Sequence, residues 1–170
     1  MTIRPIVYLP EPVLRRKAKP VSRFDESLQT LIDDMIETMR AAPGVGLAAP
    51  QVGVSERVIV VEYAENDEDE NAPKKLYVVL NPEIKQLSKE VELGVEGCLS
   101  VPSLLGEVER SLEVRVKGLT RRGQPTRIKA KGWMARIFQH EIDHLNGVVF
   151  TDRAVRVWKP EPAQPPVDNV

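Results

Sequence analysis

Both histidines of the chain lie in one short motif, His140-Glu141-Ile142-Asp143-His144. On a helix, residues four apart face the same side, so both imidazoles can reach one metal ion. Glu141 then stands beside that face, where a carboxylate can act as a general base on water held by the metal. The alternative is a pair of structural histidines on an amphipathic helix. The motif predicts a metal-dependent hydrolase.

A tetrahedral catalytic site needs a third protein ligand and one open position. Extended zinc endopeptidase motifs place that ligand six residues after the second histidine, where this chain has Phe150, which cannot ligate. The one glutamate after the motif, Glu161, lies in a proline-rich segment. Cys98 is the remaining soft ligand, although a lone cysteine is more often a small buried apolar residue. As a thiolate beside two neutral imidazoles, it would leave a divalent ion acidic enough to activate water.

Two segments have the periodicity of amphipathic helices that could position this chemistry. Apolar residues recur every three or four positions between Leu28 and Met39, after a cap at Asp25 or Ser27. A second helix, over 132–146, carries the histidine motif and ends at a glycine.

Strands are expected in four other segments. The β-branched runs 57–63 and 76–84 predict two strands, and the alternating segments 111–117 and 126–131 predict an antiparallel hairpin that turns at 122–124. We therefore expect an α+β fold, a single domain over 1–170, with antiparallel β-sheets packed around the central helix that carries the motif.

The two ends and one internal loop have compositions that disfavour regular structure. Prolines among basic residues make 1–20 an extended N-terminal arm, and the proline-rich stretch 157–170 is expected to be a mobile tail without a helix. The acidic run 65–71 is expected to be a solvated loop, although a cation or a basic partner is conceivable.

The overall composition excludes several classes of protein. With 42% hydrophobic and 29% charged residues among 170, the chain is neither disordered nor fibrous. A net charge of -1 gives no bulk attraction to nucleic acid or to a membrane surface. One cysteine cannot form an intramolecular disulfide, and no apolar run has the length of a signal peptide or a membrane span. A cytoplasmic location is expected, or an organellar one after loss of a targeting segment.

Three short segments together resemble the peptide deformylases. They are Gly44-Val45-Gly46-Leu47-Ala48-Ala49-Pro50-Gln51, Glu96-Gly97-Cys98-Leu99-Ser100 and Gln139-His140-Glu141-Ile142-Asp143-His144. The arm from Tyr8 to Arg15 is also similar to the start of that family, so the resemblance covers about residues 5–153.

The resemblance implies removal of the formyl group from the N-terminal formyl-methionine of new polypeptides, with release of formate. It implies that Cys98, His140 and His144 hold one Fe²⁺ ion, which nickel, cobalt or zinc can replace. N-formyl-methionyl nascent polypeptides would be the partners. The ribosome is a further possible partner, but this chain shows no sign of the C-terminal docking helix found in some members.

The resemblance also implies roles for residues around the metal. Glu141 would be the general base and then the acid, while Gln51 and the backbone amide of Leu99 would stabilise the oxyanion. The expected substrate-binding residues are Gly44, Val45, Gly46, Gly97, Trp133, Arg136 and Ile137. The roles of Glu96 and Asp143 stay open.

Two other functions remain to be tested against this one. A metallopeptidase that cleaves internal peptide bonds is disfavoured by Phe150. A protein that binds formylated peptides, or senses oxidation through Cys98 without turnover, belongs to a different class. Release of formate from a formyl-methionyl peptide separates all three.

Overall fold

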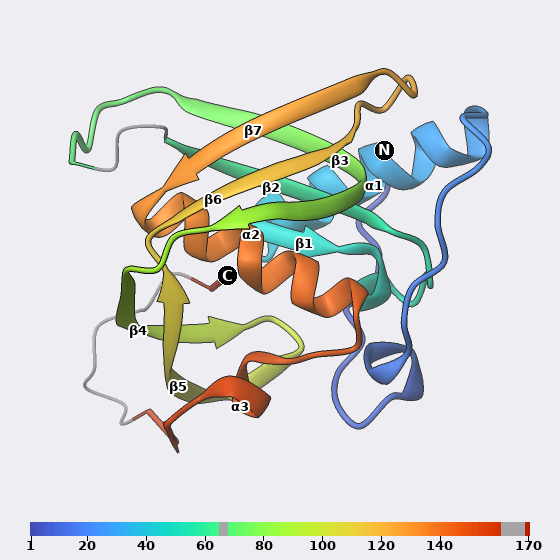
Figure 1. Cartoon of the computed structure of the whole chain (residues 1–170). Helices are drawn as coiled ribbons and strands as arrows, with labels where there is room; N and C mark the ends of the chain where they lie inside the picture. The colour runs from blue at the N-terminus through green and yellow to red at the C-terminus, as the bar shows by residue number, and fades with distance from the viewer. Residues whose placement is uncertain (65–67, 161–168) are drawn as a thin grey trace.

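The computed structural model describes residues 1–64, 68–160 and 169–170 (Figure 1). Within these residues, the larger sheet has five antiparallel strands in the order β1-β2-β3-β6-β7. They are β1 Gly46–Ala48, β2 Val58–Ala64, β3 Lys74–Leu87, β6 Glu113–Leu119 and β7 Pro125–Lys131. The described chain contains no helix that is both long and apolar enough to cross a membrane.

A smaller antiparallel sheet, of three strands among the described residues, has the order β4-β5-β8. Its strands are β4 Val91–Cys98, β5 Val101–Ser111 and β8 Arg156–Trp158. Only Leu99 and Ser100 separate β4 from β5, so Cys98 pairs with Val101 directly beside the turn. Because β1 and β4 each end the strand order of a sheet, each has one edge without a strand partner in its own sheet.

The principal helices are α1 Glu26–Ala41 and α2 Gly132–Leu145, and the short helical segments are η1 Pro12–Arg15, η2 Ala49–Val52 and α3 Phe150–Arg153. Figure 1 shows α2 between the two sheets and α1 on the opposite face of the larger sheet.

The first four residues of β2 are buried, and strand alternation divides their side chains between the two faces of the larger sheet. Val58 and Val60 pack in the apolar cluster that contains α1, whereas Ile59 and Val61 pack in the cluster that contains α2. This follows from the two-residue period of a strand. It also explains why the sequence of β2 is continuously apolar over these four residues rather than alternating.

The α+β architecture with antiparallel sheets around the motif-bearing helix is confirmed. Both expected helices form, and α1 is capped by Asp25, whose carboxylate accepts a 3.0 Å hydrogen bond from the Leu28 amide. The predicted hairpin is β6–β7, and Gly123 supplies a positive φ of 83° in its turn. The β4–β5 hairpin, which carries Cys98, was not predicted from periodicity.

The expectations for the two ends need correction. The N-terminal arm is extended except at Pro12–Arg15, which form a 3-10 turn. Val157 and Trp158 are not a mobile tail, because they pair with β5 as part of β8. At the far end, Val170 is fully buried. Residues 161–168, and 65–67 of the acidic loop, lie outside the described residues.

The buried ring of Phe138 on α2 generates a stability prediction. It is fully buried and packs edge-on against Tyr77 of β3, with ring centroids 5.6 Å apart. Phe138→Ala should lower the free energy of unfolding by about 3–5 kcal/mol, because the variant buries less apolar surface and leaves a cavity. Urea denaturation measures this, with Leu87→Ala as the control, because Leu87 is 51% exposed. Equal losses in the two variants would contradict the packing described.

Candidate metal centre

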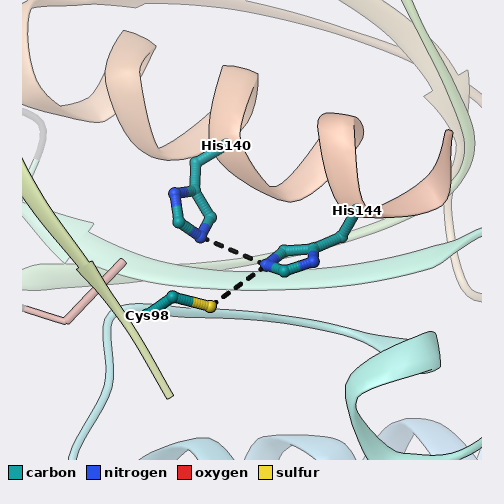
Figure 2. A group of neighbouring side chains, drawn as sticks. All are labelled: Cys98, His140 and His144. Carbon is teal, nitrogen blue, oxygen red and sulfur yellow. Dashed lines mark hydrogen bonds between the residues drawn. The ribbon is translucent and has the colours of Figure 1, made fainter. Parts of the chain in front are cut away.

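Three potential metal ligands converge from two elements. Cys98 ends β4, and His140 and His144 project from successive turns of α2 (Figure 2). The Nε2 atom of His144 lies 3.3 Å from the Cys98 sulfur and 3.2 Å from Nε2 of His140. The ligand atoms of all three residues lie within 4.8 Å of one another. The side chains are at most 2% exposed, so few water molecules could solvate the donors individually.

This set of donors fits a divalent ion of intermediate softness. One sulfur and two imidazole nitrogens are the ligand types of catalytic zinc sites and also suit iron, cobalt or nickel. Metal-binding histidines normally donate a hydrogen bond from the N–H of their second ring nitrogen to a fixed acceptor, and this sets the tautomer. Here Nδ1 of His140 lies 2.8 Å from a carboxylate oxygen of Glu96, which leaves Nε2 of His140 directed at the site.

Glu96 is the centre of a buried ionic network. Its carboxylate is fully buried and accepts two hydrogen bonds from Arg110 of β5, at 2.9 and 3.0 Å, and one from Arg136 of α2, at 2.7 Å. Burial alone would raise the pKa of Glu96, but the hydrogen bonds from His140 and Arg110 outweigh it and hold the pKa well below its usual value. An ionised carboxylate only accepts hydrogen bonds, so Nδ1 of His140 is the donor.

Asp143 extends this network to α3. Its carboxylate accepts a 2.7 Å hydrogen bond from Arg110 and bonds of 2.6 and 3.0 Å from Arg153 of α3. Arg110 therefore connects two carboxylates, Glu96 and Asp143, that the sequence left without a role. Within the motif, Asp143 precedes His144 and His140 bonds to Glu96, so the network contacts the histidine motif at two positions.

Glu141 differs from these carboxylates because none of the described residues hydrogen-bonds either of its oxygens, although it is fully buried. Burial raises the pKa of Glu141 to about 7. Its side chain lies against Gly46, where an added Cβ would come within 2.9 Å of the Glu141 carboxyl carbon. A glycine is therefore required there, and a buried carboxylate without a partner is typical of a group that acts on a reactant.

Gln51 is held with its amide nitrogen towards the metal ligands. Its Oε1 accepts a 3.0 Å hydrogen bond from the backbone N–H of Ala48, which fixes the orientation of the amide. Its Nε2 donates to Ser100 at 3.2 Å and lies 3.6 Å from the Cys98 sulfur. Leu99 follows Cys98 in the turn between β4 and β5, so its backbone amide directly adjoins the ligand.

The predicted substrate-binding residues fall into two groups. Gly44, Val45, Gly46 and Gly97 lie at or beside the free edges of β1 and β4. Ile137 is fully buried in the apolar cluster of α2, against which Val45 and Trp133 pack.

Arg136 has a structural role that the sequence did not predict. Besides Glu96, its guanidinium donates to the carbonyls of Val108, at 2.9 Å, and Glu92, at 2.7 Å. These bonds join α2 to the β4–β5 hairpin, and contact of Arg136 with substrate stays a prediction.

Sequence reasoning missed Arg110, Ser100 and the position of Phe150. Arg110 follows Val108 on the inward face of β5, and a charge at an apolar position of an alternating strand is the signal that could have revealed it. Phe150 stacks on His140, with ring centroids 6.2 Å apart and planes 19° apart. The residue at the endopeptidase ligand position therefore packs beside a potential metal ligand.

This chain is similar in sequence to known proteins over most of its length. A family model for polypeptide deformylase matches residues 3–159. The peptide deformylase of Halothermothrix orenii is 50% identical over 157 residues, which cover 92% of this chain and 97% of that protein. The peptide deformylase of Symbiobacterium thermophilum is also 50% identical over 157 residues, or 92% of this chain and 69% of that protein.

Solved structures agree with these sequence matches. The crystal structure of a peptide deformylase from Legionella pneumophila superposes with a TM-score of 0.80 at 48% identity, over 89% of this chain and 86% of that one. The Met-Ala-Ser-bound structure of the class I type b peptide deformylase from Acinetobacter baumannii gives a TM-score of 0.82 at 44% identity, over 89% and 98%. By sequence and by structure, the chain belongs to the polypeptide deformylase family of enzymes.

Proposed function

We propose that this protein removes the formyl group from N-formyl-methionyl nascent polypeptides in a metal-dependent hydrolysis. The observation that carries the proposal is the convergence of Cys98, His140 and His144 beside Glu141, a buried carboxylate without a hydrogen-bond partner among the described residues. A deformylase of the same fold binds Met-Ala-Ser, and this supports a peptide with N-terminal methionine as the product released here.

Cys98, His140 and His144 would hold the ion, and Fe²⁺ is the proposed resident, with nickel, cobalt or zinc able to replace it. When bound, a divalent ion acts as a Lewis acid that favours ionisation of water near neutral pH. Glu96 prepares the site for it by fixing the tautomer of His140.

Glu141 would move the proton. It accepts a proton from the attacking water as the new C–O bond forms at the formyl carbon. It then delivers that proton to the nitrogen as the C–N bond breaks, which releases formate and a free amino group. Both oxygens of Glu141 are buried and accept no hydrogen bond from the described residues, so none of these bonds has to break first.

Two donors would stabilise the negative charge that develops on the formyl oxygen. The amide nitrogen of Gln51 is one, because Ala48 holds the opposite end of that amide and leaves the N–H groups directed towards the ligands. The backbone N–H of Leu99, next to Cys98, is the other. Preorganised donors of this kind are among the largest contributions to acyl-transfer catalysis.

The peptide would bind as an added strand between the edges of β1 and β4. Val45 and Gly97 would supply main-chain partners, and Gly44 and Gly46 would allow close approach. The apolar cluster around Trp133 and Ile137 would receive the methionine side chain.

The proposal places the protein in the cytoplasm, where new polypeptides are made. Docking on the ribosome through a C-terminal helix is not included, because four prolines within 160–166 disfavour such a helix.

The acyl group gives the first test of this function. Gln51, the Leu99 amide and the metal would converge on one oxygen, so an acetyl methyl group would displace the attacked carbon. Formyl-Met-Ala-Ser should have a kcat/KM at least about a thousandfold above that of acetyl-Met-Ala-Ser, the product of steric and positional effects. Formate or acetate release on one metal-loaded preparation measures the ratio. Rates within tenfold would indicate a general acylase, and cleavage of an internal peptide bond would indicate an endopeptidase.

A second test separates proton transfer from metal binding. Glu141→Gln keeps the shape of the side chain against Gly46 but cannot accept the proton, so kcat should fall by about 10²–10⁴-fold. Zinc content, measured by mass spectrometry of the metal, should stay at about one ion per chain, as for any non-ligand. Glu109→Gln, an exposed glutamate on β5, is the matched control and should keep full activity. Normal turnover in Glu141→Gln would assign the proton to another group.

A further inference from the structure

The last two residues of the printed sequence lie between the edges of β1 and β4, which belong to different sheets. The carbonyl of Asn169 accepts a 3.2 Å hydrogen bond from the Val45 backbone N–H, beside the edge of β1. The backbone N–H of Val170 donates a 3.2 Å bond to the Gly97 carbonyl, on the edge of β4. Asn169 and Gly97 form a parallel β-bridge. The segment therefore joins two sheet edges that have no strand between them in either sheet.

The side chains of this segment are in close contact with their surroundings. Val170 is fully buried and belongs to the apolar cluster that includes Ile137, against which Trp133 and Val45 also pack. An added Cβ at Gly97 would lie 2.9 Å from the side-chain oxygen of Asn169, so the absence of a side chain there admits the segment. Figure 1 shows the end of the chain beside α2, in the interior of the molecule.

We propose that Asn169–Val170 is a tethered competitor of the peptide substrate. The inference rests on the proposed function, because Val45 and Gly97 are the main-chain partners, and Ile137 part of the pocket, proposed there for substrate. The segment bonds to both main-chain partners and places an aliphatic side chain in the cluster proposed for methionine. Substrate must displace it before binding.

Competition of this kind has a defined kinetic consequence. A ligand tethered to its own site acts at an effective concentration on the order of millimolar for short linkers, so a weak contact is sufficient to compete. The apparent affinity for substrate is the intrinsic affinity multiplied by the fraction of molecules from which the segment has left its site. The chemical step is unaffected, because the segment has left before substrate reacts. KM should therefore change while kcat does not.

The experiment uses the full chain loaded with zinc and two variants of one residue. Val170→Asp places a charge in the apolar cluster and should release the segment, which lowers KM for formyl-Met-Ala-Ser at least about threefold with kcat unchanged. Val170→Met, which suits a methionine pocket, should keep KM at least as high as in the parent. A KM that is the same in all three proteins would overturn the proposal.

Amide hydrogen exchange supplies a readout that does not depend on activity. Exchange of the Val45 amide should accelerate in Val170→Asp, because its acceptor on Asn169 leaves. The Ala48 amide is the internal reference, since it is bonded to the side chain of Gln51 and should exchange as before. Unchanged exchange of the Val45 amide would mean that the segment does not bind there through Val170. Faster exchange with an unchanged KM would mean that the segment does not compete with substrate. If none of the proteins released formate, the proposed function would fail, whereas the exchange result would still report on the segment.

Discussion

The site depends on the hydrogen bonds and ion pairs of the buried Glu96 carboxylate. A fully buried charge is costly unless opposite charges and hydrogen bonds compensate it. Its partners are Arg110 on β5 and Arg136 and His140 on α2, so compensation requires that the β4–β5 hairpin and α2 lie together. Cys98 is on the same hairpin as Glu96, two residues further along. The electrostatic requirement of one side chain therefore brings the thiol and the imidazoles into one place.

The same packing brings the edges of β1 and β4 together next to the potential metal ligands. With the smaller sheet fixed against α2, the edges of β1 and β4 are close enough for Asn169–Val170 to bond to both. Glycines at the edges allow backbone and the Glu141 carboxylate to approach closely, as at Gly46 and Gly97. The potential metal ligands, the buried Glu141 carboxylate and the proposed peptide site thus share the same few elements, as the proposed deformylation requires.

The sequence predicted the parts of this account that depend on local pattern. Helical spacing identified α2, and the four-residue interval placed His140 and His144 on one face. Pattern alone could not reveal the partnership of Glu96 with Arg110, because buried ion pairs have no period. The bonds from the Arg136 guanidinium to the hairpin were not predicted either, and contact of Arg136 with substrate, which the family resemblance implies, stays a prediction. The proline content after Trp158 predicted a mobile tail without a helix, but it carried no information on where Asn169 and Val170 would bind.

The zinc affinity of Glu96→Gln shows directly whether Glu96 prepares the proposed metal site. The dissociation constant for zinc should rise by about 10–100-fold, which is typical when a carboxylate that hydrogen-bonds a metal-binding histidine is removed. Glu107→Gln on the same hairpin, which removes only a surface ion pair with Arg156, should bind zinc like the parent. Circular dichroism would establish that both variants are folded. Unchanged zinc affinity in folded Glu96→Gln would mean that Glu96 does not prepare the site.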